Sequence, residues 1–306
     1  MRVLIVAEES AGIQVVRLVA GSGHETVGVL TAPATRGGGA TVATVAEGLG
    51  LRRLESERVK DSAFAEWIRG EQVDLLLNVH SLFVIHPAVV AAPRVGSFNL
   101  HPGRLPDYAG LNAPSWAIYR REASHAVTLH WMAAGIDTGA IAYEHEFELG
   151  PKDTGLSVSM RCVTEGLRLV ERLLEAAERG AIPARPQPVE GRRYFGRDAP
   201  EGGLVAWARP AHELEAFVRA CDYFPFASPW GHPVARLGDG RAVELLKVSL
   251  TGEESGGPPG TVGDVVGSAV PVGTGDHCLL VERVRVDGEI LDGAAALTPG
   301  SRVADG

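Results

Sequence analysis

Continuous apolar runs alternate with helix-like segments through the first half of this chain. Strands that are apolar throughout are buried on both faces, and helical connections between such strands produce parallel sheets. The pattern therefore predicts an α/β fold built on a mostly parallel sheet. The strands are predicted at residues 3–7, 26–31, 73–79, 95–100 and 126–132, and the helices at residues 10–21, 41–50 and 61–70.

A proline-rich segment divides the chain. A long helix is predicted from residue 153 to residue 180, and prolines then interrupt regular structure up to residue 210. One helix and several short strands with glycine-rich turns follow, which is typical of a small OB-like β-barrel. We therefore expect a catalytic domain at residues 1–180, a linker at residues 181–209 and an OB-like domain at residues 210–306. The C-terminal helix is predicted at residues 211–221, and the strands at residues 234–237, 242–248, 260–266 and 277–285.

Charge and composition exclude several function classes. The chain has 29 Lys and Arg residues against 38 Asp and Glu residues, a net charge of −9, which argues against affinity gained from phosphate contacts. The first predicted strand ends in Ala7-Glu8-Glu9, without a glycine-rich phosphate motif, and the glycines at 37–39 are only a cluster, so NAD and ATP are not expected. The three cysteines follow no metal or disulfide spacing. No signal peptide or membrane-length apolar run is present, and we expect a cytoplasmic protein with no membrane partner.

Polar residues occur where two of the predicted strands run into loops. Asn99 and His101 lie in Asn-Leu-His-Pro-Gly-Arg-Leu-Pro, and Asp137 lies in Gly-Ile-Asp-Thr-Gly. When an amine attacks a carbonyl carbon, an amide can donate to the oxyanion, and an imidazole can donate a second hydrogen bond or act as an acid. A carboxylate can hold the imidazole as a cation and accept the amine proton. We predict these roles for Asn99, His101 and Asp137 in that order, with no covalent intermediate.

The order and spacing of these motifs resemble those of the folate-dependent formyltransferases. The pattern continues with Tyr108-Ala109-Gly110, a helix pattern to Arg120 and the strand before Gly-Ile-Asp-Thr-Gly. The resemblance covers residues 1–180 at motif level and extends more weakly to the C-terminal domain. It implies a Rossmann-like catalytic domain that carries Asn99, His101 and Asp137. It also implies an enzyme that moves a formyl group from 10-formyltetrahydrofolate to an amine.

The resemblance places the pterin ring of the donor between two loops. These contribute Phe83, Val84 and Ile85 on one side, and Ala133, Gly135 and Ile136 on the other. An apolar pocket with exposed backbone N–H and C=O groups suits a flat heterocycle. The chain departs from the family pattern in two places, because Gly103-Arg104 replaces the usual Ser-Leu and Ala133 replaces a residue that is commonly acidic.

The acceptor is predicted from charge. The tRNA-directed members of the family carry a basic insertion after the second strand and a basic C-terminal domain, whereas residues 31–40 here contain one charged residue and residues 251–275 contain no Lys or Arg. We therefore rank a small-molecule or carrier-bound amine above tRNA, with an amino acid, a hydroxyornithine-type amine or an aminoacyl group as examples. The stretch from His101 to Trp116, which includes residues 111–116, resembles formyltransferases of secondary metabolism. A sugar nucleotide, then methionyl-tRNA, then water as in a hydrolase remain the alternatives.

Five residues are expected on the acceptor side. Glu8, Glu9 and Ser10 follow the first strand at the edge that carries the motifs, and a carboxylate there could receive an ammonium group. The alternative for this acidic pair is stabilisation of a helix N-terminus. Arg104 could contact an acidic part of the substrate or be a solvated loop charge, and Tyr108 lies in the adjoining loop.

A metal site is not expected. The histidines lack zinc-binding spacing, and no metal cofactor is predicted. His130 alternates with Trp131 on a predicted strand, so the two side chains are expected on opposite faces. The histidines considered together with His101 as metal ligands are His80, His86, His125 and His130.

The sequence leaves open whether the chain forms a homodimer.

Overall fold

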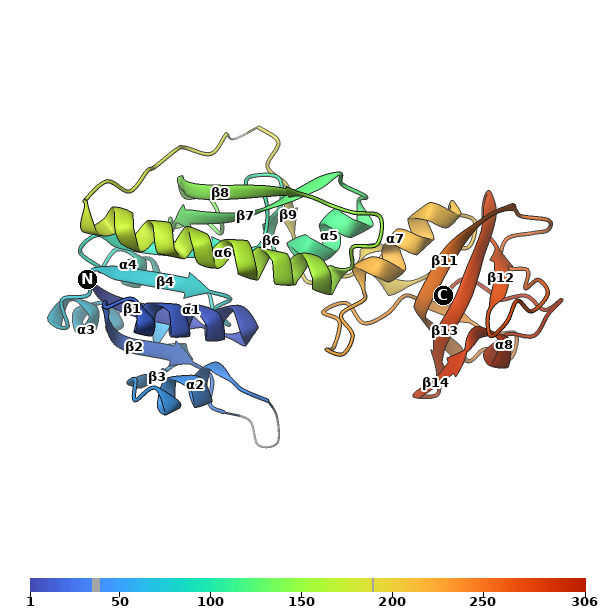
Figure 1. The fold of residues 1–306 in the computed structure, drawn as a ribbon, viewed down its shortest axis with the longest axis horizontal. Helices are drawn as coiled ribbons and strands as arrows, with labels where there is room; N and C mark the ends of the chain where they lie inside the picture. The colour runs from blue at the N-terminus through green and yellow to red at the C-terminus, as the bar shows by residue number, and fades with distance from the viewer. Residues whose placement is uncertain (35–38, 189) are drawn as a thin grey trace. The chain divides into compact units, whose positions relative to one another are not determined.

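A computed structural model describes residues 1–34, 39–188 and 190–306 (Figure 1). The glycine cluster noted at residues 37–39 lies mostly outside these ranges. The chain divides into two compact units. Unit 1 comprises residues 1–110, 125–147 and 159–195, and unit 2 comprises residues 111–124, 148–158 and 196–306. Segments inside the first predicted domain thus group with unit 2, and the predicted boundaries at 180 and 210 stay a prediction.

Unit 1 is built on one sheet. Within the described residues, seven strands form it in the order β3-β2-β1-β4-β5-β7-β8. Its strands are β1 (Arg2–Ala7), β2 (Glu25–Thr31), β3 (Arg53–Glu55), β4 (Leu75–Val79), β5 (Gly96–His101), β7 (Ser124–Trp131) and β8 (Ile141–Glu148). The helices that connect them are α1 (Glu9–Gly21), α2 (Val42–Gly48), α3 (Phe64–Gly70) and α4 (Pro87–Val90), and α6 (Gly155–Glu178) follows β8. A further strand pair joins β6 (Ala109–Gly110) to β9 (Tyr194–Phe195).

The strands form where the sequence is most apolar. Residues 3–7 of β1 and 75–77 of β4 are buried, as expected for strands covered on both faces. On one face, Leu4 and Val6 pack with Phe64 and Ile68 of α3 and with Val89 of α4. This core fixes the carboxyl ends of β1 and β4 at one edge of the sheet. The mostly parallel α/β fold predicted from the sequence is confirmed.

One strand runs against the prediction of parallel pairing. β7 is antiparallel to β5, with Asn99 opposite His130 and His101 opposite Thr128. Strand direction depends on the side from which the connecting segment returns to the sheet, and an apolar run carries no such information. Asn99 also lies inside β5 and not at its end, so its side chain is placed by the sheet.

Unit 2 contains helices and a curled antiparallel sheet. The helices are α5 (Ala113–Tyr119), the start of α6, α7 (Ala211–Ala220) and α8 (Gly293–Ala296). The strands are β10 (Val234–Arg236), β11 (Ala242–Glu254), β12 (Val270–Gly273), β13 (His277–Val286) and β14 (Glu289–Asp292). They pair in the order β10-β11-β13-β12, with β14 also on β13, which is consistent with the predicted OB-like domain. A buried apolar cluster that includes Trp207 and Leu279 fills this unit.

Two details of this sheet differ from the sequence prediction. The strand expected at residues 260–266 is reduced to isolated bridges at Thr261, Val262 and Val266. The short strands β12 and β14 were not anticipated, because four-residue segments give too little alternation to be recognised.

In the described part of the chain, no helix is long and apolar enough to cross a membrane.

Candidate active site

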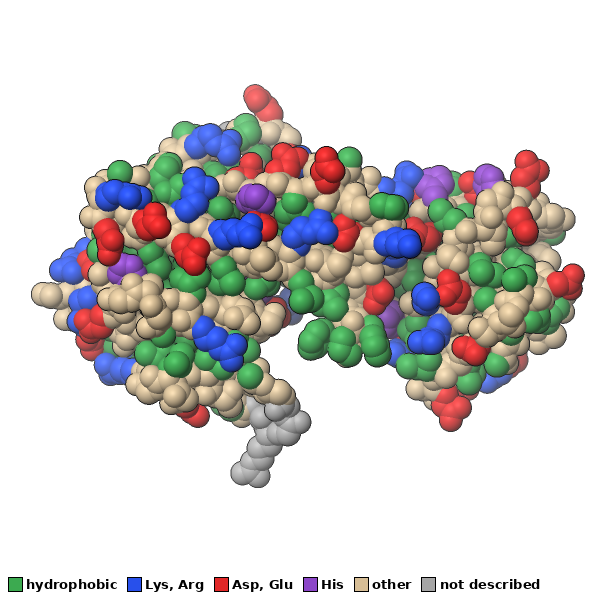
Figure 2. Space-filling model, viewed as in Figure 1, with side chains coloured by type: hydrophobic (Ala, Val, Ile, Leu, Met, Phe, Trp, Pro, Cys, Tyr) green, Lys and Arg blue, Asp and Glu red, His purple; other side chains and the backbone are tan. Residues whose placement is uncertain are grey.

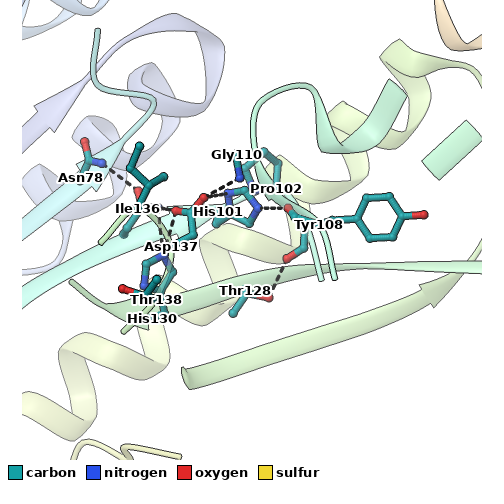
Figure 3. A network of polar contacts seen from close by, with 12 residues as sticks. Asn78, His101, Pro102, Tyr108, Gly110, Thr128, His130, Ile136, Asp137 and Thr138 are labelled. Atoms are coloured by element: carbon teal, nitrogen blue, oxygen red, sulfur yellow. Dashed lines mark hydrogen bonds and ion pairs between the residues drawn. The ribbon is translucent and has the colours of Figure 1, made fainter. Parts of the chain in front are cut away.

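Three neighbouring strands of unit 1 direct polar side chains to one place (Figure 3). Asn99 on β5 lies beside Asn78 on β4 and opposite His130 on β7. Asn78 Nδ2 donates to Asn99 Oδ1 at 2.8 Å, and Asn99 Nδ2 lies 3.0 Å from His130 Nε2. Because the Asn99 oxygen accepts from Asn78, its amide nitrogen faces His130. The sheet register therefore fixes the orientation of the Asn99 amide.

Asp137 reaches the same place from the loop after β7. Its backbone is left-handed, with φ of 52°, and its side chain is 8% exposed. Oδ1 accepts from Asn99 Nδ2 at 3.2 Å, and Oδ2 accepts from the backbone N–H of Gly110 at 2.8 Å. His101 Nδ1 lies 3.6 Å from Oδ2, and His130 Nε2 lies 3.4 Å from Oδ1. The structure thus brings together the three residues that the motifs singled out.

His101 has a defined proton position. Its Nε2 lies 2.6 Å from the backbone oxygen of Tyr108, and since a carbonyl only accepts, Nε2 carries a proton. Burial lowers the pKa of His101, and the neighbouring Asp137 carboxylate partly opposes that effect. The neutral ring therefore keeps its proton on Nε2 and turns the lone pair of Nδ1 towards the region of Asp137.

The environment keeps Asp137 ionised. Burial by itself would raise the pKa of this carboxyl group, but His101, His130 and the Gly110 N–H together hold it well below its usual value. A buried carboxylate beside an imidazole is an arrangement that can stabilise a proton arriving on the ring.

The loop after β5 is anchored from β7. Thr128 Oγ1 donates to the Gly103 carbonyl at 2.7 Å, and His125 Nε2 donates to the Pro102 carbonyl at 3.0 Å. Burial lowers the pKa of His125 to about 4, so this ring is neutral. These bonds hold the backbone that presents the Tyr108 oxygen to His101.

The loop that carries Asp137 is also tied down. Gln187 Nε2 donates to the carbonyls of Asp137 and Gly139 at 2.9 and 2.7 Å, and Arg192 donates to the Ile136 carbonyl at 2.9 Å. All of these residues belong to unit 1. The segment that follows α6 therefore supports the left-handed turn at Asp137.

The two loops predicted to hold the donor differ in exposure. Ala133, Gly135 and Ile136 are exposed in the loop before Asp137, and Val84 is exposed in the loop after β4. Ile85 is buried in the core, and Phe83 is partly buried with Lys60 over its ring. Leu82, which the sequence analysis did not select, is exposed beside Val84.

The residues expected on the acceptor side separate in the structure. Glu8 accepts from Thr31 Oγ1 at 3.0 Å and from the backbone N–H of Ala32 at 2.7 Å, so this carboxylate braces the end of β2. Ser10 is exposed in the first turn of α1, and Glu9 lies 3.0 Å from His80 Nδ1.

Arg104 and Tyr108 are held within unit 1. Arg104 forms an ion pair with Glu146 on β8. The ring of Tyr108 is buried and stacks on Phe195, with Arg193 over its face. The side chain of Tyr108 is therefore a packing group, whereas its backbone oxygen belongs to the His101 environment.

Sequence reasoning missed Asn78 and His130 as members of this network. Each is a polar residue in an otherwise apolar strand, and that contrast was the available signal. The register that places both beside Asn99 could not be read from the chain alone.

In the described ranges, no cluster of three or more His, Cys, Asp or Glu side chains could hold a metal ion.

Comparison with known proteins identifies the family. Residues 3–173 match the model of the formyl transferase family, and residues 199–298 match its C-terminal domain. A methionyl-tRNA formyltransferase from Methylobacterium sp. (strain 4-46) is 30% identical over 313 residues, covering 100% of this chain and 98% of that protein.

Solved structures share the fold. The N-formyltransferase from Helicobacter canadensis, in a complex with folinic acid and dTDP-3-aminofucose, aligns with a TM-score of 0.69 and 15% identity over 91% of this chain and 97% of its own. HypX from Aquifex aeolicus, in complex with tetrahydrofolic acid, aligns with a TM-score of 0.63 and 22% identity over 97% of this chain and 47% of its own. The sequence matches and the shared fold together place this chain in the family of folate-dependent formyltransferases.

Proposed function

We propose that this enzyme transfers the formyl group of 10-formyltetrahydrofolate to the amine of a small-molecule or carrier-bound substrate. The observation that carries the proposal is the network of Asn99, His101 and Asp137, in which His101 and Asp137 are buried. The ionised carboxylate of Asp137 lies 3.2 Å from the amide nitrogen of Asn99 and 3.6 Å from Nδ1 of the neutral His101 imidazole. Direct attack of an amine on a formyl carbon needs these three functions.

The chain offers a suitable surface for the donor. Val84, Leu82 and Ile136 expose apolar side chains on the two loops that the family resemblance selected. The exposed backbone at residues 133–135 adds N–H and C=O groups. A pterin ring has two apolar faces and an edge of alternating donors and acceptors, so these loops fit it. The bound donor supplies the activated formyl carbon.

His101 acts as the proton acceptor in this proposal. With Nε2–H committed to the Tyr108 carbonyl, the lone pair of Nδ1 can take the proton that the attacking amine loses. The resulting imidazolium N–H faces Asp137 Oδ2, whose negative charge stabilises it. The sequence analysis gave Asp137 the amine proton and the stabilisation of a cationic imidazole; because burial lowers the pKa of His101, the present proposal gives the proton to His101 and keeps the stabilising role for Asp137.

Asn99 stabilises the oxyanion. Its two amide hydrogens point to His130 Nε2 and Asp137 Oδ1, and its orientation is fixed by Asn78. When negative charge develops on the formyl oxygen, one of these two hydrogens leaves its present acceptor and donates to that oxygen. A preset amide orientation reduces the reorganisation that this step requires.

Charge favours an acceptor other than a large polyanion. Residues 196–306 contain nine Lys and Arg residues against sixteen Asp and Glu residues, a formal charge of −7. On the face shown in Figure 2, basic and acidic side chains are interspersed. Binding of tRNA phosphates would favour a basic surface. An amino acid, a hydroxyornithine-type amine or a carrier-bound aminoacyl group fits this charge better, which is consistent with a role in secondary metabolism.

A second candidate acceptor is methionyl-tRNA. It is favoured by the full-length similarity to the Methylobacterium methionyl-tRNA formyltransferase at 30% identity. A sugar nucleotide is the third candidate, because a structural neighbour is described in complex with dTDP-3-aminofucose. Transfer to water, as in a hydrolase, would use the same network without an amine.

An acceptor screen tests the proposal. Purified enzyme and 10-formyltetrahydrofolate are incubated with amino acids, diamines, amino sugar nucleotides, aminoacylated carriers and methionyl-tRNA, and tetrahydrofolate release and formylated product are measured. We expect release that depends on a small or carrier-bound amine. Exclusive use of methionyl-tRNA or of a sugar nucleotide would replace the proposed acceptor. Formate release without any amine requirement would identify a hydrolase.

A further inference from the structure

Two adjacent glutamates at the end of β1 have different environments. Glu8 is bound to Thr31 and to the backbone of Ala32, as described above. The side chain of Glu9 is 74% exposed, and its Oε2 lies 3.0 Å from His80 Nδ1. Among the residues that the structure describes, His80 is the only polar partner of this carboxylate. Glu9 is thus held at one oxygen and accessible at the other.

The backbone at both partners is unusual. Glu9 has φ of 59° and His80 has φ of 60°, which is the left-handed region that side chains with a Cβ rarely adopt. His80 directly follows β4, and Glu9 is the first residue of α1, two positions after the end of the adjacent strand β1. The turns that contain them bring two side chains from separate strands into contact, and backbone strain of this kind concentrates at functional sites.

The pair lies at the strand edge that carries the catalytic network. β1 pairs with β4 up to Ala7 and Val79, and β4 pairs with β5 at Asn78 and Asn99. Neighbouring strands are about 5 Å apart, so β1 lies about 10 Å from β5, whereas the Glu9 carboxylate reaches His80 after β4, which is about one strand spacing from β5. His80 also contributes to the lowered pKa of His101, which places the two rings within electrostatic reach.

Asn78 lies between the pair and the network. Its Nδ2 donates to Asn99, whereas its Oδ1 is buried and accepts no hydrogen bond from the described residues. A buried carbonyl oxygen without a donor is unfavourable, and an amine N–H would satisfy it. This oxygen is a suitable contact for the attacking amine next to Asn99.

We propose that Glu9, oriented by His80, binds a second cationic group of the acceptor while its first amine approaches Asn99. This inference rests on the proposed function. An amine that attacks a carbonyl carbon must be neutral, so the cation at Glu9 is a different group from the nucleophile. The preferred acceptors are therefore diamines or basic amino acids with amino groups roughly 5–10 Å apart. Acceptors with a phosphate at this position are repelled.

Matched amines test the inference. Formylation of 1,5-diaminopentane is compared with that of pentylamine, which lacks the second cation, in the wild type and in Glu9→Gln and His80→Asn. Asn is chosen because it tolerates the left-handed backbone. We expect the wild type to prefer the diamine by about 5- to 10-fold in kcat/KM, as for a charged contact that is partly exposed. Glu9→Gln should abolish this preference by raising KM for the diamine.

The ratio of kcat/KM for the diamine to kcat/KM for pentylamine, measured within one variant, does not depend on the fraction of folded protein. A loss of stability therefore cannot imitate the effect. Glu178→Gln is the matched control, because Glu178 is an exposed glutamate paired with His24 before β2, at the opposite edge of the sheet. It should keep the preference. Equal use of both amines by the wild type, or an unchanged ratio in Glu9→Gln, overturns the inference and leaves formyl transfer intact. Failure to formylate any amine refutes the proposed function itself.

Discussion

At the scale of single residues, the site depends on which atoms carry protons. The Tyr108 carbonyl fixes a proton on His101 Nε2, and the Trp131 carbonyl, 2.7 Å from His130 Nδ1, fixes a proton on that nitrogen. His130 Nε2 is then free to accept from Asn99. Each imidazole is thus oriented by a backbone oxygen, and each leaves a lone pair facing the region between Asn99 and Asp137.

The first prediction concerns the two ionisable members of the network. His101→Asn and Asp137→Asn should lower kcat for formyl transfer by about 10²- to 10⁴-fold, the usual contribution of a general acid or base. Donor binding should change much less, because the proposed pterin contacts are exposed groups of the two loops, whereas the side chains of His101 and Asp137 are buried. Steady-state kinetics and equilibrium binding of a folate analogue check this, and near-wild-type turnover in either variant would contradict the assigned roles.

His130→Phe provides a second prediction at this scale. It removes the acceptor for one Asn99 N–H and leaves the other hydrogen on Asp137. We expect kcat to fall by about 10-fold, because His130 positions Asn99 and does not itself contact the reacting atoms. If kcat fell as far as in His101→Asn, His130 would instead have a direct part in the proton transfer.

At the scale of elements, the site depends on short backbone pairings as well as on the main sheet. Gly110 belongs to β6, which pairs with Phe195 of β9, and its N–H holds Asp137. Its φ is 96°, and an added Cβ would lie 2.2 Å from the Phe195 backbone oxygen. The segment after α6 therefore supports the Asp137 carboxylate through Gly110.

Gly110→Ala should separate β6 from β9 and remove the N–H from Asp137. We expect a loss of roughly 2–4 kcal/mol in the free energy of unfolding, together with reduced kcat, because both strain and a backbone clash are introduced. Denaturant unfolding and kinetics measure the two effects. Gly48→Ala at the end of α2, where an added Cβ meets no atom within 4 Å, should change neither property appreciably.

The elements also show how far the sequence could be interpreted. Buried strands such as β1 and β4 were predictable, because a short, continuously apolar run between two helical segments is typical of a strand buried on both faces. The antiparallel direction of β7 was not, since it depends on the path of residues 102–123 between β5 and β7. The same limit concealed His130, because only the antiparallel register places it opposite Asn99. The motif residues themselves were recognisable from their spacing, whereas the neighbours that orient them required the sheet.

At the scale of the whole molecule, stability and charge give further tests. His125 is buried and neutral, with a pKa of about 4, whereas an unfolded chain has a histidine pKa near 6.5. Between these values the unfolded state binds more protons, so stability falls as pH decreases. This one ring accounts for about 1.4 kcal/mol per pH unit, or roughly 3 kcal/mol across the window.

His125→Phe should therefore flatten the dependence of stability on pH. We expect the slope of the unfolding free energy between about pH 4.5 and 6 to decrease by about 1 kcal/mol per pH unit relative to the wild type. Denaturant titrations at several pH values measure it. Parallel curves for the two proteins would show that His125 is not the buried neutral group described here.

The acidic charge of the chain predicts a weak response to salt. For a small amine acceptor, kcat/KM should change by less than about 3-fold between low and moderate ionic strength, because no array of phosphate contacts is released. A steep loss of activity with added salt would favour a polyanionic acceptor such as tRNA.

Transfer of the formyl carbon itself tests the central claim most directly. Enzyme is mixed with 10-formyltetrahydrofolate labelled in the formyl carbon and with an amine identified in the acceptor screen, and the label is followed by mass spectrometry in the wild type and in His101→Asn. We predict that the wild type moves the label to the amine in step with tetrahydrofolate release, and that His101→Asn does so at least about 100-fold more slowly. Label recovered only as formate, or equal transfer by the two proteins, would contradict direct transfer assisted by His101.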